Sequence, residues 1–369
     1  MAFLIFISCK ELNEKNALPS LVELTVVDSV LIKENNFFLN GQFHVHLVGD
    51  SLIGVSSYKS PSVGFYHISG NQRKRIASGD YPVGSFLPSY FDASEYPIVY
   101  VLDKRSESVL IFDVDEQKLI KKIKLELPFG KEIKIIGSKF KKLPEGFLLE
   151  LASSEFDNLD SKYFKESGKL IYYFDELGQI RDGSFLEYPI EIKNVNGSLR
   201  AIDYLQFCSF EEEIYFVFPH ERKIKYFDAK NFGQLIEEIP LPESRYFNFQ
   251  LIGAEKIYSI EEMDKSRTPN RMDIPQNHYF NSIFAKKDFL FVQTWMNTKI
   301  EKERSQTFSH LLIYDKPNKK WLETANPLNI LDIGMLAGVV NDTLYFYEGS
   351  LMKHDEKYVK RAVLRPIKE

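Results

Sequence analysis

The amino-acid sequence predicts an all-β protein, a six-bladed β-propeller of four-stranded antiparallel blades. Three observations predict it: short apolar-aromatic runs that end in Asp recur along the chain, an unbroken apolar run precedes each of them, and charged alternating segments follow the clearest copies. Copies of the Asp-terminated run occupy 109–113, 171–175, 224–228 and 311–315, with weaker copies at 63–67 and 351–355. From His67 to Asp355 the chain covers 288 residues in five steps, a mean of about 58. This period is typical of propeller blades.

Each repeat thus contains an apolar run, an Asp-terminated run and a charged alternating segment, which we interpret as successive strands of one blade. The preceding apolar runs lie at 52–55, 98–102, 147–149, 214–218, 290–292 and 344–347. Such runs indicate middle strands, which neighbouring blades cover on both faces. The Lys- and Glu-rich segments, clearest at 119–125 and 235–239, indicate outer strands that face water and whose charges oppose edge-to-edge association.

The repeated Asp residues are predicted to be structural. An Asp after a strand can accept hydrogen bonds from nearby backbone N–H groups and set the following turn. A catalytic residue is rarely copied into every repeat. We therefore expect Asp113, Asp175, Asp228, Asp315 and Asp355 to form turns.

Two segments depart from the repeat. The distance from Asp228 to Asp315 is 87 residues, and the excess falls in 243–280. A long loop insertion is the favoured interpretation, and a degenerate seventh blade is the alternative. Residues 22–27 form a further expected strand outside the six units, placed to pair with the last blade and fasten the ring.

Composition excludes some functions. The chain has 369 residues, of which 44% are hydrophobic and 27% charged, as expected for a folded protein. Its net charge of −5 offers no bulk attraction to nucleic acid. No stretch approaches 18 apolar residues, so no transmembrane helix is expected. We expect no nucleic-acid partner.

The N-terminal segment resembles a processing signal. Residues 2–8 form a short apolar run before Cys9, which resembles the end of a bacterial lipoprotein signal peptide. Cleavage would make Cys9 the lipid-modified N-terminus, with 1–19 as signal and tether and 20–369 as one propeller domain. The predicted location is the cell envelope, as an outer-membrane lipoprotein facing the periplasm or the cell surface and held by its lipid alone. The alternative is a chance cysteine. Cys208 is expected to be a small buried hydrophobe.

With its repeats placed, the chain resembles the TolB-like six-bladed propeller lipoproteins of unknown function that are common in Bacteroidetes. The resemblance covers about residues 20–367 and depends on the repeat, the 14% aromatic content and the N-terminal signal. It implies a propeller fold and an envelope location. That family has no assigned active site, so the resemblance implies no functional residue.

Two motifs could carry chemistry. Residues 49–52 (Gly-Asp-Ser-Leu) match the nucleophile block of an esterase family, but they are predicted to form a tight turn. His44 and His46 project from one face of an expected strand, since side chains alternate with period two. If that strand is innermost, both line the central channel. A metal would need a third ligand, with His278, Asp203 and Asp332 as candidates, and hydrogen-bonded channel histidines are the favoured interpretation. We expect no metal, no cofactor and no catalytic residue.

The segments that lead into the innermost strands are the predicted binding site. In propellers such segments gather at one mouth of the central channel. The predicted ligand-binding residues combine polar and aromatic side chains: Arg200, Asp203, Tyr204, His278, Tyr279 and, in an expected hairpin turn closer to the opposite mouth or the rim, Trp295. The predicted function is a non-catalytic envelope propeller that binds a sugar, a peptide or a protein partner. The alternatives are a channel-centred lyase or hydrolase, with or without a metal, and a structural subunit of an envelope complex.

Overall fold

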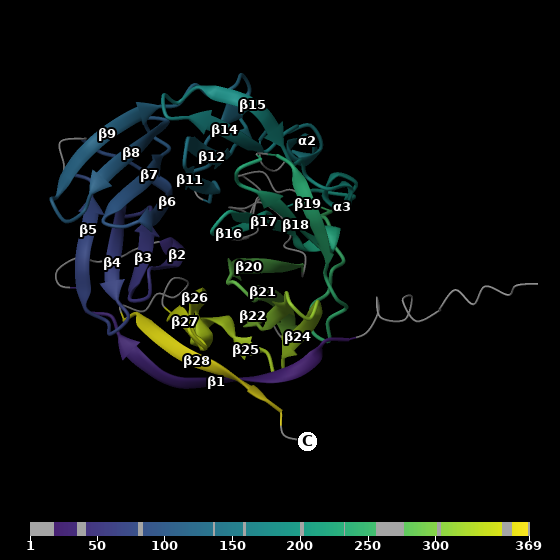
Figure 1. The fold of residues 1–369 in the computed structure, drawn as a ribbon. Helices are drawn as coiled ribbons and strands as arrows, with labels where there is room; N and C mark the ends of the chain where they lie inside the picture. The colour runs from purple at the N-terminus through teal and green to yellow at the C-terminus, as the bar shows by residue number, and fades with distance from the viewer. Residues whose placement is uncertain are drawn as a thin grey trace, which may run out of the picture.

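The computed structural model is a ring of four-stranded antiparallel sheets around a central axis (Figure 1). It describes residues 18–34, 42–79, 84–135, 137–157, 160–199, 203–231, 233–255, 277–300, 304–348 and 356–367. The segments that contain Cys9, Arg200, most of the expected insertion (256–276) and the last Asp-terminated run (351–355) lie outside the described residues. Six blades make up the described ring, which confirms the predicted six-bladed propeller.

The first four blades are separate sheets, each ordered from the axis outward. Blade 1 consists of β2 (Gln42–Val48), β3 (Leu52–Ser57), β4 (Ser62–His67) and β5 (Gln72–Ala77). Blade 2 consists of β6 (Pro88–Glu95), β7 (Ile98–Asp103), β8 (Ser108–Asp113) and β9 (Lys118–Lys124). Blade 3 consists of β11 (Phe140–Leu143), β12 (Gly146–Glu150), β14 (Ile171–Asp175) and β15 (Ile180–Phe185). Blade 4 consists of β16 (Gln206–Phe210), β17 (Glu213–Phe218), β18 (Lys223–Asp228) and β19 (Leu235–Pro240).

Blades 5 and 6 belong to one ten-stranded sheet. Blade 5 consists of β20 (His278–Ala285), β21 (Phe289–Ile300), β23 (Leu311–Asp315) and β24 (Lys320–Thr324). Blade 6 consists of β26 (Met335–Val340), β27 (Thr343–Glu348), β28 (Tyr358–Pro366) and β1 (Ser20–Leu31). The remaining elements are β10 (Lys131–Glu132), β13 (Ala152–Ser153), β22 (Arg304–Ser309), β25 (Leu328–Asn329), α2 (Ser161–Lys165), α3 (Ile190–Lys193), α5 (Ile330–Ile333) and the short 3-10 helix η1 (Pro219–Glu221).

The N-terminal strand closes the ring. β1 pairs antiparallel with β28 over residues 22–31, and Ser20–Val22 also pair in parallel with β24. The chain therefore fastens its first strand onto its last, as expected for 22–27. The sequence placed this strand outside the six units, whereas it is the fourth strand of blade 6. The third strand of that blade is β28, and not the run at 351–355, because β28 is the strand that pairs with β27.

The hydrophobic core is divided among the blade interfaces. The described residues form six buried apolar clusters, and each lies between two neighbouring blades. Val63 and Phe65 of blade 1, for example, pack with Val99 of blade 2. This arrangement explains the unbroken apolar runs, because both faces of a middle strand are covered.

The four repeated Asp residues within the described part of the chain form turns, as predicted, and Asp355 lies outside it. Asp113 Oδ1 accepts hydrogen bonds from the backbone N–H groups of Asp115 (3.0 Å) and Glu116 (2.9 Å). Asp228 Oδ1 accepts one from Lys230 N–H at 2.8 Å, and Asp315 Oδ1 accepts one from Asn318 N–H at 3.0 Å. Each side chain holds the turn between the third and fourth strands of its blade.

Removing one of these turn bonds should destabilise the domain moderately. Asp113→Ala and Asp228→Ala are each expected to lower the free energy of unfolding by about 1–2 kcal/mol, because the turn N–H groups lose their acceptor. Urea denaturation measures the loss. Asp115→Ala, in the same turn as Asp113 but with an exposed side chain, is the control and should change stability by less than about 0.5 kcal/mol. Equal losses in Asp115→Ala and Asp113→Ala would contradict the turn role.

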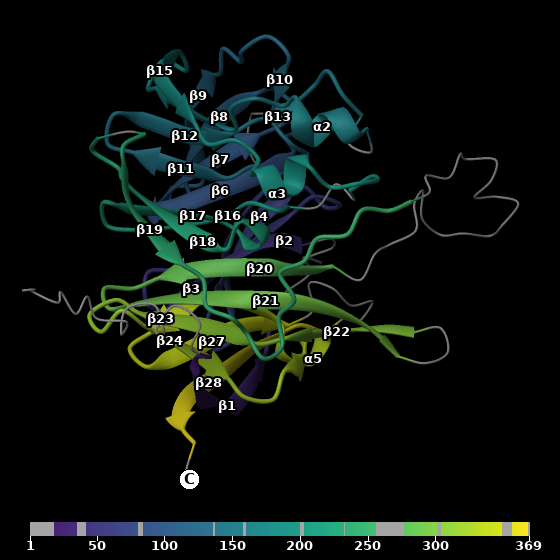
Figure 2. The same cartoon turned by 90° about the vertical axis from the view of Figure 1, so that its right-hand side faces the viewer.

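Because every blade has four strands, the innermost strands all run in the same direction along the axis. We call the two ends of the axis the N-terminal and C-terminal ends of the channel, after the ends of these strands. The short helices α2, α3 and α5 lie on one side of the ring, which is the N-terminal end, since α3 and α5 directly precede innermost strands (Figure 2). None of the helices in the described part of the chain is long and apolar enough to cross a membrane.

Candidate functional site

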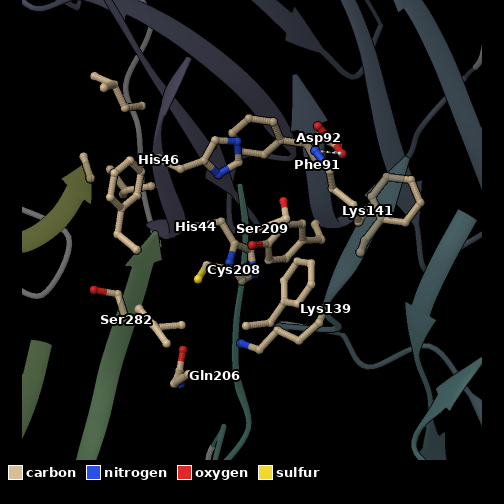
Figure 3. Close-up of a pocket in the computed structure, with 18 of the residues that line it drawn as sticks. His44, His46, Phe91, Asp92, Lys139, Lys141, Gln206, Cys208, Ser209 and Ser282 are labelled. Atoms are coloured by element: carbon tan, nitrogen blue, oxygen red, sulfur yellow. Dashed lines mark ion pairs between the residues drawn. The ribbon is translucent and has the colours of Figure 1, made fainter. Parts of the chain in front are cut away.

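A cavity of about 280 Å³ lies on the ring axis. The innermost strands of all six blades contribute to its lining: β2, β6, β11, β16, β20 and β26. Alternate side chains of these strands point at the axis, because strand side chains alternate between two faces. Figure 3 shows that charged and aromatic side chains from different blades converge on this space.

His44 and His46 both face the cavity. They lie two residues apart on β2. β2 is the innermost strand of blade 1, which was the condition for these side chains to line the channel. The His44 ring lies 4.1 Å from the Tyr90 ring, and the His46 ring stacks on Phe91 at 4.2 Å. Phe91 reaches this position because Gly54 has no side chain, since a Cβ there would approach the Phe91 ring to 2.7 Å.

Both imidazoles are neutral at neutral pH. Burial is the main cause that lowers the pKa of His44 well below its ordinary value, and the nearby Lys139 ammonium adds to it. Burial likewise lowers the pKa of His46 to about 4, although the Asp92 carboxylate opposes the shift. A neutral imidazole offers one N–H donor and one lone pair. Each histidine can therefore donate one hydrogen bond and accept another.

One of these nitrogens has no partner. His44 hydrogen bonds with the backbone of Ser89, while its Nε2 is buried and makes no hydrogen bond in the described structure. Buried polar atoms are nearly always paired, and each exception needs an explanation. A ligand group in the cavity would supply the missing partner.

A cluster of charged side chains, partly or fully buried, lies near the N-terminal end of the cavity. Lys139 Nζ forms an ion pair with Asp203, and Lys134 Nζ lies 3.3 Å from the other carboxylate oxygen of Asp203. Lys134 also lies 2.5 Å from Glu150, whose side chain is almost fully buried. Burial alone would raise the pKa of Asp203, but the Lys139 and Lys134 ammonium groups hold it below its ordinary value. Asp203 is therefore ionised at neutral pH.

A second lysine–aspartate pair lies nearer the C-terminal end. Lys141 Nζ is 3.1 Å from Asp92 Oδ2, and Figure 3 shows this pair beside His46 and Phe91. The backbone N–H groups of Ser94 and Lys142 donate to the two oxygens of Asp92, each at 2.8 Å. Burial would raise the pKa of Asp92, but Lys141 and these N–H groups lower it overall. The cavity thus contains two levels, each with one His, one Lys and one Asp.

The exposure of the lining residues varies along the cavity. Lys139 and Gln206 are buried at the N-terminal end, whereas Gly49 and Ser94 are exposed at the other end. Asp203, at the N-terminal end, is also partly exposed, with 32% of its side chain accessible.

The predicted binding residues do not all face the cavity. Asp203 lines the cavity, and Arg200 lies outside the described residues. Tyr204 is only 2% exposed and packs in the apolar cluster between blades 3 and 4, where its ring lies 5.7 Å from the Tyr279 ring, so its predicted contact with a ligand is wrong. His278 begins β20 and accepts a hydrogen bond from Asn248 N–H at 2.9 Å. These residues therefore lie at the N-terminal end, as the sequence indicated.

Trp295 differs from its expected position. The sequence placed it in a hairpin turn near the opposite mouth or the rim, whereas it lies within the long strand β21 and pairs with Tyr279. It is therefore on the same side as His278. Its indole N–H donates to Asn297 Oδ1 at 3.0 Å. The unbroken apolar run in β21 ends at Val292, whereas the strand continues to Ile300. The sequence pattern therefore did not reveal the strand's full length.

Sequence reasoning missed Asp92, Lys139 and Lys141. One signal could have found the lysines, since Lys139-Phe140-Lys141 alternates with the period of a strand that faces a polar channel. Asp92 lies in a strand too irregular to recognise, because β6 contains two register shifts. Gly49-Asp50-Ser51 forms the turn between β2 and β3, as predicted.

The described residues contain no group of three His, Cys, Asp or Glu side chains placed to hold a metal ion. Of the three candidate third ligands for His44 and His46, Asp203 lines the same cavity, whereas Asp332 lies in α5 and His278 at the start of β20. Cys208 also lines the cavity, and burial raises the pKa of its thiol. It is buried, as expected.

Comparisons with known proteins support the propeller fold. No family model matches the chain, and no curated protein is similar in sequence. A member of the DUF4221 family from Bacteroides vulgatus ATCC 8482 has a similar structure, with a TM-score of 0.64 and 12% identity over 94% of this chain and 99% of that one. A protein from Bacteroides fragilis NCTC 9343 that is proposed to be exported gives a TM-score of 0.53 and 12% identity over 96% and 100% of the two chains. At such identities the likeness shows the fold alone.

Proposed function

We propose that this chain is a non-catalytic binding propeller of the cell envelope that holds a small polar ligand in its central cavity. The observation that carries the proposal is the unpaired, buried Nε2 of His44 beside two lysine–aspartate pairs in a cavity of about 280 Å³. Of the residues predicted from the sequence, Asp203 would contact the ligand, whereas Tyr204 is buried in the core and would not.

The polar lining favours a binding role over a purely structural one. Burying a charged or polar group costs several kcal/mol unless it is fully paired, and an apolar channel would avoid that cost. Leu, Val and Phe fill the blade interfaces of this chain, and such residues could have filled the channel in the same way. Two lysine–aspartate pairs instead line the cavity on the axis, where a ligand can reach them.

The envelope location rests on the N-terminal segment. The apolar run before Cys9 would direct export and lipid attachment, as in the TolB-like propeller lipoproteins that the chain resembles. The similar fold of the B. fragilis protein that is proposed to be exported is consistent with this location.

We expect Cys9→Ala to abolish retention in the membrane fraction, because the chain would lose its lipid anchor. Fractionation of cells that express the full chain, followed by immunoblotting, measures retention. Cys208→Ala is the matched control and should leave retention unchanged, since its thiol is buried in the domain. Equal membrane recovery of wild type and Cys9→Ala would contradict lipidation.

A channel-centred lyase or hydrolase is the second candidate. The neutral imidazole of His46 is in the protonation state of a general base, and it lies beside the Lys141–Asp92 pair. Turnover of a bound compound that stops in His46→Gln, while binding persists, would favour this candidate over a binding protein.

Filling the cavity should abolish binding. Ser209 lines the cavity on β16, and Ser209→Phe would place an aromatic ring in it. We expect that at least one compound in a panel of monosaccharides, amino acids, dicarboxylates and nucleosides raises the melting temperature of the wild type but not of Ser209→Phe. A ligand at one hundred times its Kd stabilises a protein by about 2.7 kcal/mol, which a thermal-shift assay detects.

Ser154→Phe is the control for this experiment, because Ser154 is exposed and does not line the cavity. It should keep the response of the wild type. A panel in which nothing stabilises the wild type, or stabilisation that persists in Ser209→Phe, would contradict binding in the cavity.

A further inference from the structure

The charges that line the cavity cancel. Lys139 pairs with Asp203 and Lys141 pairs with Asp92, so the lining holds two cations and two anions. Both imidazoles are neutral. Lys134 and Glu150, which lie behind the first pair, also balance each other. A charged ligand would have to break one of these pairs or remain without a counter-ion in a site largely removed from water, and both are costly.

The residues that line the cavity nevertheless have both hydrogen-bond donors and hydrogen-bond acceptors without partners in the described part of the chain. Lys141 Nζ has three N–H donors and lies within bonding distance of one acceptor, Asp92. The Asp203 carboxylate has about four acceptor positions and faces two lysines. His44 Nε2 has no hydrogen-bond partner among the described residues. An occupant that satisfies these groups must both donate and accept hydrogen bonds, which hydroxyl groups do.

Aromatic side chains also contribute to the lining, together with aliphatic and small polar ones. Phe207 and Phe284 line it from two different blades and are partly exposed, whereas Phe91 is fully buried beneath His46. Aromatic rings bury apolar area and offer flat faces on which a C–H surface can stack. The volume of about 280 Å³ is slightly below the range of roughly 300–1,000 Å³ that drug-sized ligands occupy. The cavity thus has room for about one six-membered ring with its substituents.

From the balanced charges, the two-sided hydrogen-bonding capacity and the aromatic side chains in the lining, we infer that the ligand is an uncharged, polyhydroxylated ring the size of a monosaccharide. The inference rests on the proposed function, because it assumes that the cavity is a binding site. His44 Nε2 and Asp203 accept from the hydroxyl groups of the ligand, and Lys141 donates to a hydroxyl oxygen. The aromatic residues cover its C–H face.

Matched sugars test this inference. Each of three neutral sugars, glucose, galactose and mannose, is compared with its uronic acid and its 2-amino sugar by isothermal titration calorimetry at neutral pH. These compounds share one ring and differ in charge. We expect at least one neutral sugar to bind, and to bind at least ten-fold more tightly than both of its charged counterparts. A uronate or an amino sugar that binds more tightly than its neutral parent would overturn the inference, and so would absence of binding in all three series.

A variant at His44 tests whether the sugar binds in the cavity. His44→Leu removes the unpaired lone pair and should weaken binding of the neutral sugar about ten-fold, because a ligand hydroxyl would lose its acceptor. His67→Leu is the control, since His67 hydrogen bonds with Ser69 outside the cavity. Unchanged sugar affinity in His44→Leu, with the fold verified by circular dichroism, would overturn the inference.

Failure of this inference is distinguishable from failure of the proposed function. An amino acid or a dicarboxylate that stabilises the wild type but not Ser209→Phe would retain the cavity as a binding site and exclude a neutral sugar as its ligand.

Discussion

Removal of residues 1–31 is expected to abolish the cooperative unfolding transition of the domain. These residues include β1, which supplies the outer strand of blade 6 and pairs with both β28 and β24. Without β1, one long edge of β28 is left unpaired, and Val22 and Leu24 no longer cover the apolar cluster between blades 5 and 6. Arg361 would also lose Asp28, with which it forms a bidentate ion pair. An open edge of this length promotes association with other chains.

Removal of residues 1–17 is the matched control, because it leaves β1 whole. Thermal denaturation followed by circular dichroism, with light scattering for aggregation, compares the two truncations. The shorter truncation should melt like the full chain, and the longer one should show no sharp transition or should aggregate. A longer truncation that melts cooperatively near the temperature of the full chain would contradict closure of the ring by β1.

Glu323→Ala is expected to lower the free energy of unfolding by about 3–5 kcal/mol. Glu323 lies on β24 opposite Leu21 of β1, and its side chain is fully buried. His310 Nε2 lies 3.0 Å from Glu323 Oε1, and Arg245 Nη1 lies 3.2 Å from Oε2. Burial would raise the pKa of Glu323, but hydrogen bonds from His310 and Ser244 lower it overall. Alanine would leave several buried donors without an acceptor.

This network also fixes the start of β1, because Arg245 Nη1 donates to the carbonyl oxygen of Pro19 at 2.6 Å. Equilibrium denaturation in urea measures the loss. Glu237→Ala is the control: Glu237 is an exposed glutamate paired with the exposed Lys319, and its loss should change stability by less than about 0.5 kcal/mol. A loss below about 1 kcal/mol in Glu323→Ala would show that the network does not stabilise the closure.

The repeated runs predicted the fold because each blade buries its middle strands in the same way. Periodicity and the Asp turns therefore identified the third strands of blades 1 to 5. They failed for blade 6, where β28 reads Tyr-Val-Lys-Arg-Ala-Val-Leu-Arg-Pro and carries three basic residues among apolar ones. β28 pairs with β1 from the other end of the chain. A local sequence pattern contains no information about such a distant partner.

The candidate site was predictable only in part. The alternation of His44 and His46 placed both on one face, and an innermost strand places that face at the axis. Their relation to Lys139 and Asp92 depends on how blades 1, 2 and 3 are arranged around the ring, which no local pattern shows. Asp203 was selected from a loop rich in polar groups, and its ion pair with Lys139 joins residues that are 64 positions apart.

Nuclear magnetic resonance of the imidazole nitrogens tests binding in the central cavity most directly. In protein labelled with ¹⁵N-histidine, the seven histidines of the chain are assigned with single His→Gln variants. Addition of the compound that most stabilises the wild type in the thermal-shift panel should shift the Nε2 resonance of His44 and the ring resonances of His46. Those of His310, which is buried against Glu323, should stay in place. Saturable binding that leaves both His44 and His46 unshifted would place the ligand outside the cavity and contradict the proposed site.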